Sequence, residues 1–163
     1  MKKIIIAVSI VFLLANCNSP KSNAVEQATG IQEMVKANTP GYVATSADGY
    51  YMKAKINGKE WVAESMMPPE EPARILGDKN GESISLPFDR RDMVVGSKTN
   101  FENSAVDLFL NDDVGMWGGH KGEMVVTKVD DKAAEGTFYF TASGNNTTKT
   151  VNVTEGFFRV IFK

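Results

Sequence analysis

Apolar and polar residues alternate along the segment that begins at Tyr50. Apolar side chains occupy every second position from Tyr50 to Ile56, and Tyr51 and two lysines lie between them. This is the period of a β-strand with one buried face. Asn57-Gly58 follows, the pair most typical of a two-residue type I′ turn. The segment therefore predicts a β-hairpin.

The two-residue turn also predicts how the two strands of this hairpin pair. Opposite charges would meet on the outer face, and Trp61 would lie inside, opposite a small alanine, which places Trp61 in the core. The predicted partners are Ile56 with Lys59, Lys55 with Glu60, Ala54 with Trp61, and Met52 with Ala63.

The rest of the chain is built from short apolar runs separated by turn residues. Such runs occupy residues 74–77, 83–88, 93–95, 105–110, 123–129, 136–142, 149–154 and 157–162. Turn-forming residues fill 78–81 and 144–146. Short strands with frequent turns predict an all-β fold, a single antiparallel β-sandwich or barrel of about eight to ten strands over residues 48–163. Phe138 and Phe140 alternate with polar neighbours and are expected in its core.

The N-terminus has a different pattern. Two lysines precede a run from Ile4 to Ala15 in which only Ser9 is polar. A positive start followed by a short apolar run is typical of a secretory signal. The run is too short to span a bilayer, which takes about 20 apolar residues. We therefore expect residues 1–16 to be an export signal.

The end of this run, Leu13-Leu14-Ala15-Asn16-Cys17, resembles the lipobox of bacterial lipoproteins, although Asn16 departs from the small residue usual before the cysteine. Cys17 is the only cysteine, so it cannot form an internal disulfide in an oxidising compartment. We expect a lipid on Cys17 to anchor the chain to a membrane, in the cell envelope and at the outer membrane of a Gram-negative bacterium. The alternative is a free exported thiol after ordinary cleavage.

Residues 17–47 are polar and small, and they predict a lipidated tether. Residues 18–22 have the composition of a flexible linker. From Val25 to Val35 the apolar spacing is compatible with a short helix, which Gly30 would interrupt.

Charge and motifs then narrow the function. Without residues 1–16 the chain has 16 basic and 20 acidic residues, a net charge of −4, which argues against a nucleic-acid partner. A single histidine, His120, excludes a metal site built from several histidines, and no P-loop, nucleophile elbow or dinucleotide fingerprint occurs. We predict a non-enzymatic protein without cofactor or metal. A carboxylate pair for sugar hydrolysis has no sequence motif and stays open.

One segment, residues 111–123, gathers unusual residues. Asp112, Asp113, Trp117 and His120 lie there among four glycines. Binding groups concentrate on loops, so these four residues are candidate contacts to a protein or glycan partner. The acids match no calcium-binding spacing. The alternative is a glycine-rich connection in which Trp117 fills the core.

Three stretches carry a family resemblance: residues 54–61 with the "ING" turn and Trp61, residues 136–142 with the letters GTFYFTA, and residues 153–158 with VTEGFF. Together with the lipobox they resemble small, uncharacterised β-rich lipoproteins of the Bacteroidota. The resemblance implies an envelope β-domain and carries no catalytic residue over.

The sequence thus predicts an envelope-anchored lipoprotein that acts as a non-enzymatic binding module. Two alternatives remain open at this point. One is a lipocalin-like carrier with a hollow barrel, and the other is an immunity-type lipoprotein that neutralises a toxin or enzyme.

Overall fold

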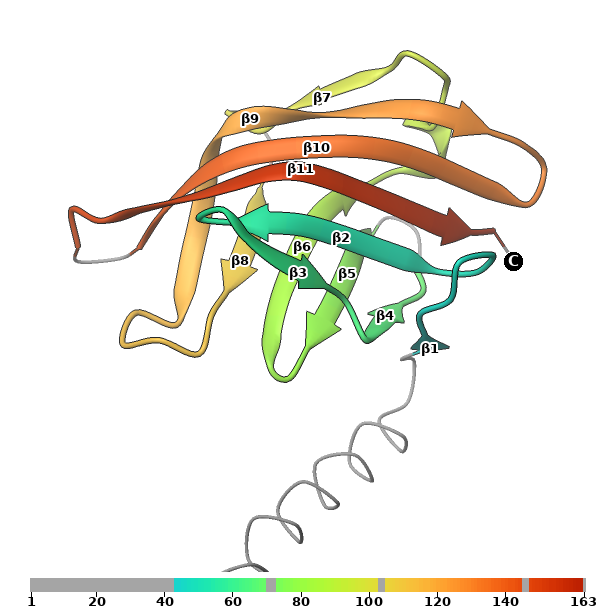
Figure 1. The fold of residues 1–163 in the computed structure, drawn as a ribbon. Helices are drawn as coiled ribbons and strands as arrows, with labels where there is room; N and C mark the ends of the chain where they lie inside the picture. The colour runs from blue at the N-terminus through green and yellow to red at the C-terminus, as the bar shows by residue number, and fades with distance from the viewer. Residues whose placement is uncertain (1–42, 70–72, 103–104, 145–146, 163) are drawn as a thin grey trace, which may run out of the picture. The chain divides into compact units, whose positions relative to one another are not determined.

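The computed structural model describes residues 43–69, 73–102, 105–144 and 147–162. Within them all strand pairs are antiparallel, which confirms the predicted all-β class (Figure 1). No helix among these residues is long and apolar enough to cross a membrane. The elements are β1 (Val43–Ala44), β2 (Tyr51–Ile56), β3 (Lys59–Val62), β4 (Ser65–Met67), β5 (Ala73–Lys79), β6 (Glu82–Phe88), the 3₁₀ helix η1 (Arg90–Asp92), β7 (Lys98–Asn100), β8 (Val106–Phe109), β9 (Met116–Val129), β10 (Ala133–Gly144) and β11 (Thr150–Ile161).

The strands form one continuous sheet rather than the two sheets of a sandwich. Their order is β1-β4-β5-β6-β8-β9-β10-β11-β2-β3, with β7 paired to β9 beside this path. Figure 1 shows how the sheet curls: the long strands β9, β10 and β11 run across the top, and β5 and β6 lie below. The result is a half-barrel whose concave face holds the core.

The predicted hairpin is confirmed in its turn and in its register. Asn57 and Gly58 have φ values of 49° and 81°, the left-handed pair that a type I′ turn requires. Ile56 pairs with Lys59, and Ala54 pairs with Trp61. Trp61 is buried, as the alternation predicts. Local pattern and turn chemistry were therefore enough to specify this part of the fold.

Three strands are longer than predicted, with 14 residues in β9 and 12 each in β10 and β11. Residues that look like strand ends in the sequence are bulges in the structure. Glu155 has a φ of 52°, and the register of β11 against β2 shifts between Thr154 and Phe157. A bulge bends a strand and increases its twist without ending it. Two predicted strands therefore merge into β11.

Reciprocal glycine–phenylalanine pairs join β10 to β11. Gly136 lies opposite Phe158, and Phe138 lies opposite Gly156. A Cβ on Gly136 would overlap the ring of Phe158, and a Cβ on Gly156 would lie 2.5 Å from the ring of Phe138. Each phenylalanine thus occupies the space that the opposite glycine leaves open. The "GTF" and "GFF" motifs of the sequence therefore supply the glycines and phenylalanines of this packing.

The predicted strand at residues 93–95 is wrong. Asp89 caps η1 by accepting a hydrogen bond from the Arg91 amide, and the chain turns there. Met93 reaches the core, whereas Val94 and Val95 are 62% and 60% exposed. The chain begins to pair with β9 only after these residues, at Gly96, whose amide donates to Val126 O at 2.8 Å just before β7. A three-residue apolar run cannot distinguish a strand from a turn with one anchoring side chain.

The sheet begins earlier than predicted. β1 pairs with β4 through Val43 and Ala44, so these two residues belong to the sheet and not to the tether expected over residues 17–47. The predicted signal peptide, Cys17 and the candidate helix lie outside the described residues.

One segment joins the two ends of the curled sheet, and we call Lys59–Met67 the closing segment. Its first part pairs with β2 as far as Ala63, whose amide donates to Met52 O at 2.9 Å. From Glu64 onward it pairs with β5, since the Glu64 amide donates to Asp78 O at 2.8 Å. The change of partner between two adjacent residues brings β2 and β5 together around the core.

The concave face is filled by large side chains that form a single cluster. The fully buried members include Met52, Met66, Ile75, Ile84, Leu86, Phe101, Leu108, Met124, Phe140 and Phe158. Phe101 meets Phe140 edge to face, with ring centroids 5.9 Å apart. Phe138 and Phe140 are both buried, as predicted.

The glycine–phenylalanine pairs generate a test of the fold. Gly136→Ala should destabilise the domain by about 1–3 kcal/mol, because the new methyl group overpacks against Phe158 and would lie 2.6 Å from Val125 O. The measurement is urea unfolding. Gly118→Ala on β9 is the matched control, since a Cβ there meets nothing within 4 Å. Equal midpoints for the two variants would contradict the packing described.

Candidate functional site

The structure corrects the candidate loop over residues 111–123. The loop is short, because β9 already begins at Met116, and Trp117 and His120 are strand residues. Trp117 is 3% exposed, so its indole packs in the core and cannot stack on a ligand. The expectation that Trp117 contacts a partner is therefore wrong. The sequence could not decide this, because the glycines of β9 look like loop residues.

Asp112 has an internal role in this loop. Its carboxylate accepts hydrogen bonds from the amides of Val114 and Gly115, at 3.0 and 2.8 Å, and from Trp117 Nε1 at 3.2 Å. Burial raises the pKa of Asp112, but the hydrogen bonds from Gly115, Val114 and Trp117 outweigh it and hold the pKa below 3.8, its ordinary value. Asp112 therefore fixes the loop and the indole of Trp117.

The other two candidates are exposed and lie apart from any pocket described below. Asp113 forms no hydrogen bond or ion pair with another described residue. His120 lies on β9 with its Nδ1 3.5 Å from the Ser143 hydroxyl. Their proposed contacts to a partner stay predictions. Among the described residues, no three His, Cys, Asp or Glu side chains are close enough to hold a metal ion.

A pocket that the sequence reasoning missed lies at one end of the half-barrel. We call it the mouth pocket, and its volume is about 290 Å³. It opens where the β2–β3 turn, the β5–β6 turn and the end of β8 come together. It is lined by Ile56, Asn57, Lys59, Glu60, Trp61, Lys79, Glu82 and Leu110.

Strand alternation explains which side chains reach this pocket. Inward-facing positions along each strand are two residues apart. Lys59 is two residues from buried Trp61 on the same face of β3. In the same way Lys79 is two residues from Gly77 on β5, and Glu82 is two residues from Ile84 on β6. Ile56 and Leu110 continue the inner faces of β2 and β8 in the same way. The ring around the mouth thus extends the core by one layer, and three of its five positions are charged.

Trp61 lies beneath this ring. Its side chain is 2% exposed and extends from β3 toward β5, where a Cβ on Gly77 would lie 3.2 Å from the indole Cη2. The absence of a side chain at Gly77 makes room for the indole. Trp61 Nε1 is buried, yet it has no hydrogen-bond partner among the described residues. Buried donors are rarely left without a partner, so this N–H calls for an acceptor.

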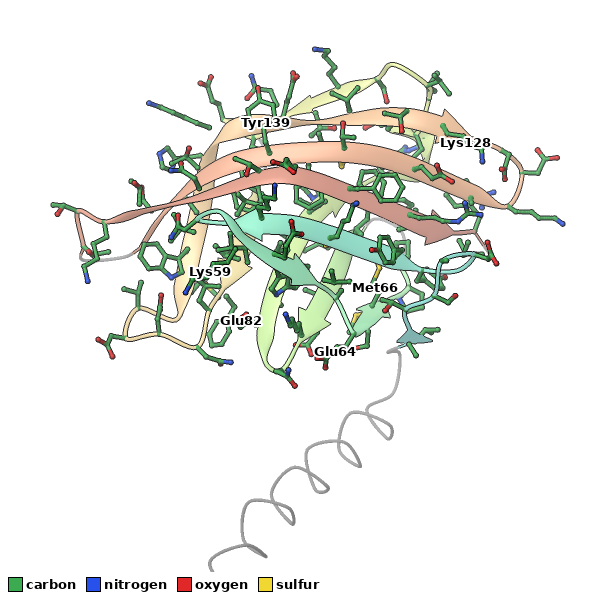
Figure 2. The ribbon with its side chains drawn as sticks, in the orientation of Figure 1. Lys59, Glu64, Met66, Glu82, Lys128 and Tyr139 are labelled. Atoms are coloured by element: carbon green, nitrogen blue, oxygen red, sulfur yellow. The ribbon has the colours of Figure 1, made fainter. Side chains whose placement is uncertain are left out.

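The charged groups of the mouth are also unpaired. Lys59, Lys79 and Glu82 form no ion pair within 4.0 Å with another described residue. Glu60, by contrast, shares Lys55 with Glu155 at the edge of the pocket. Figure 2 labels Lys59 and Glu82, which lie on the same side of the molecule and come from β3 and β6. Two lysines against one carboxylate leave the unpaired groups with a net positive charge.

The loop around Asp112 supports the pocket from outside. Asn111 donates from Nδ2 to Asn80 O at 2.9 Å, which ties this loop to the β5–β6 turn. The Leu110 amide donates to Gly115 O at 2.8 Å. Leu110 is thereby held as one wall of the mouth pocket. The candidate loop thus positions the pocket rather than contacting a ligand through Trp117.

Two other hollows are less suited to bind a ligand. A groove of about 320 Å³ on the outer face lies beside Tyr139 and Phe157, but its two carboxylates, Glu123 and Glu155, already pair with lysines at 3.3 and 2.8 Å. A hollow of about 180 Å³ at the opposite end includes Arg90, whose guanidinium lies 4.5 Å above the ring of Phe162. Neither hollow is lined by a buried polar atom without a partner.

Comparison with known proteins extends over most of this domain. The family model described as "Domain of unknown function (DUF6252)" matches residues 49–161. The chain belongs to this family. The DUF6252 match includes every residue that lines the mouth pocket, and it ends with the last residue of β11. No curated protein and no solved structure matches the chain.

The role of Asp112 generates a pH prediction. Because its folded pKa lies below 3.8, its ionised form stabilises the domain above that pH, and the contribution is lost as the pH falls through the folded pKa. Asp112→Asn should be less stable than the wild type at pH 7, and the difference should shrink below about pH 4. Urea midpoints measured from pH 7 to about pH 2.5 test this. Asp113→Asn is the matched control, and an equal pH response in both variants would contradict the assigned role.

Proposed function

We propose that this DUF6252 protein is an envelope-anchored lipoprotein that works as a non-enzymatic binding module, and that it takes a small ligand at the mouth pocket. The proposal depends mainly on the indole N–H of Trp61. This atom is buried and has no acceptor among the described residues, and Trp61 lines a pocket that also has unpaired charges at its rim. A ligand whose acceptor atom reaches this N–H would recover the cost of its burial.

The proposed anchor rests on the sequence. Cys17 is the only cysteine and follows the apolar run at the lipobox-like Leu13–Cys17. Two or three acyl chains on one cysteine bind a membrane stably, whereas a single chain binds marginally. A position at the outer membrane of a Gram-negative bacterium is part of the proposal.

The shape of the core favours a shallow binding module over the lipocalin-like carrier. A carrier of that kind holds its ligand in the barrel interior. Here the interior positions carry Met52, Ile84, Leu86, Leu108 and Phe140, all buried in one cluster. The space for a ligand lies above this layer, at the mouth. No feature of the described residues specifically favours the immunity alternative.

The anchor is tested by changing the lipidation site. Full-length Cys17→Ser, expressed in a Gram-negative host, should move from the membrane fraction to the soluble envelope fraction, because it has no thiol for the lipid. Asn16→Gly is the control, since it brings the segment nearer to the lipobox and should stay in the membrane. Membrane retention of Cys17→Ser at the wild-type level would refute the anchor.

Ligand binding is tested through the two tryptophans. In the mature chain, residues 17–163 with Cys17→Ser, ¹⁵N-labelled indoles should give one cross-peak each for Trp61 and Trp117. A set of neutral, anionic and cationic ring compounds is titrated to about 10 mM, the range in which fragments of this size bind. We expect some members to move the Trp61 peak and leave the Trp117 peak unchanged, because Trp117 already donates to Asp112.

The outcome that contradicts binding at the mouth is equally specific. If no compound in the set moves the Trp61 peak, or if both indole peaks always move together, the mouth pocket is not a ligand site.

A further inference from the structure

We propose that the mouth pocket selects small carboxylates with an apolar body, such as short aromatic or aliphatic acids. This inference rests on the proposed function and adds to it the class of ligand. It rests on the hydrogen-bond donors, the charge and the apolar walls of the pocket.

The donors of the pocket outnumber its acceptors. Trp61 Nε1 can only donate, and the ammonium groups of Lys59 and Lys79 can only donate. Among the unpaired side chains at the rim, Glu82 alone accepts. A ligand that complements this set must bring acceptors, and a carboxylate brings two oxygens with several lone pairs.

The backbone of β3 adds to this capacity. Lys59 and Ile56 close the two-residue turn, so the amides of Lys59 and Trp61 face β2. The amide of the intervening Glu60 faces the other way, and β3 is the last strand in the sheet order. The alternation is visible further along, where Ala63 bonds to β2 and Glu64 bonds to β5. A backbone N–H therefore lies on the open edge of β3 beside the pocket.

The charge of the rim favours an anion over a neutral acceptor. Lys59 and Lys79 have no carboxylate partner within 4.0 Å among the described residues, although Glu82 lies opposite Lys79 in the β5–β6 pair. Hydrogen bonds to an ionised group are about twice as strong as neutral ones. A carboxylate in the mouth would be the partner that both lysines lack.

The walls and the volume set the body of the ligand. Ile56 and Leu110 are the two aliphatic side chains that line the pocket, and Trp61 lines it as well. Small-molecule sites typically have volumes of about 300–1,000 Å³, so the pocket of about 290 Å³ suits a small molecule with one ring or a short chain. The apolar body would cover the indole, and the carboxylate would lie toward the lysines.

A matched series of three compounds tests the class. They are 3-phenylpropionate, 3-phenylpropanamide and 3-phenylpropylamine, which share one body and differ in charge. We expect the acid to move the Trp61 indole peak, the amide to bind at least about tenfold more weakly, and the amine not to bind. The Trp117 peak reports any general disturbance of the fold. The tripeptide Gly-Gly-Phe, which ends in a carboxylate, is added as a fourth compound. It distinguishes a pocket that binds free acids from one that binds peptide C-termini.

Charge variants locate the selection within the pocket. Lys59→Gln and Lys79→Gln should each weaken binding of the acid by about three- to tenfold and leave binding of the amide nearly unchanged. Lys53→Gln is the matched control, because Lys53 is an exposed lysine of β2 that lies outside the mouth pocket. All three variants change one charge on an exposed or half-buried side chain, so folding should be retained and is checked by their Tm.

The outcomes separate the ligand class from the proposed function. If the amide or the amine moves the Trp61 peak as strongly as the acid, or if the lysine variants bind the acid like Lys53→Gln, the carboxylate class is wrong and the binding site stands. If neither these compounds nor the broader set moves the Trp61 peak, both fail.

Discussion

The closing segment Lys59–Met67 is the constraint on which the rest of the structure depends. It pairs with β2 as far as Ala63 and with β5 from Glu64, so a change of partner between two residues joins the ends of the sheet. Trp61 crosses this junction and packs over Gly77, where no side chain competes for the space. The junction thereby closes the core below the indole and leaves the mouth pocket above it. Fold and candidate site share one cause.

The long strands show how a sheet of this size curls without interruption. Bulges near Glu155 bend β11, and register shifts also occur between β9 and β10. The reciprocal pairs of Gly136 with Phe158 and of Phe138 with Gly156 hold the two strands in close contact across their inner face. A glycine inside a strand has no side chain to pack, and here the phenylalanine ring of the opposite strand covers each one and stabilises it. The half-barrel is curved and still well packed.

The sequence predicted what is decided locally. The Asn57-Gly58 turn, its register and the burial of Trp61 depend on neighbouring residues, and all three are confirmed. The sequence did not predict the long strands, because a glycine inside a bulged strand cannot be distinguished by sequence from a glycine in a turn. It also left two roles open for Trp117, contact with a ligand and filling of the core, and the burial of its indole beside Asp112 decides for the core.

The mouth pocket was missed because it is assembled from the ends of five strands, β2, β3, β5, β6 and β8, which come together only in the folded sheet. Each strand supplies one inward-facing residue, and none is unusual alone. A signal was present: Lys59, Lys79 and Glu82 are charged residues at positions where the alternation calls for apolar ones. That signal could be read only once the register of each hairpin was known. The pairing of β4 with β5, which brings β2 and β5 together, was not predictable from either hairpin.

Binding at the mouth depends most on the Trp61 indole N–H, which has no acceptor among the described residues. It is tested by the ¹H chemical shifts of the two indole N–H groups in residues 17–163 with Cys17→Ser, without ligand. We expect the Trp61 proton to resonate upfield of the Trp117 proton, because Trp117 donates to the Asp112 carboxylate. A Trp61 resonance as far downfield as that of Trp117, without added ligand, would mean that the Trp61 N–H already has an acceptor and would contradict the proposed site.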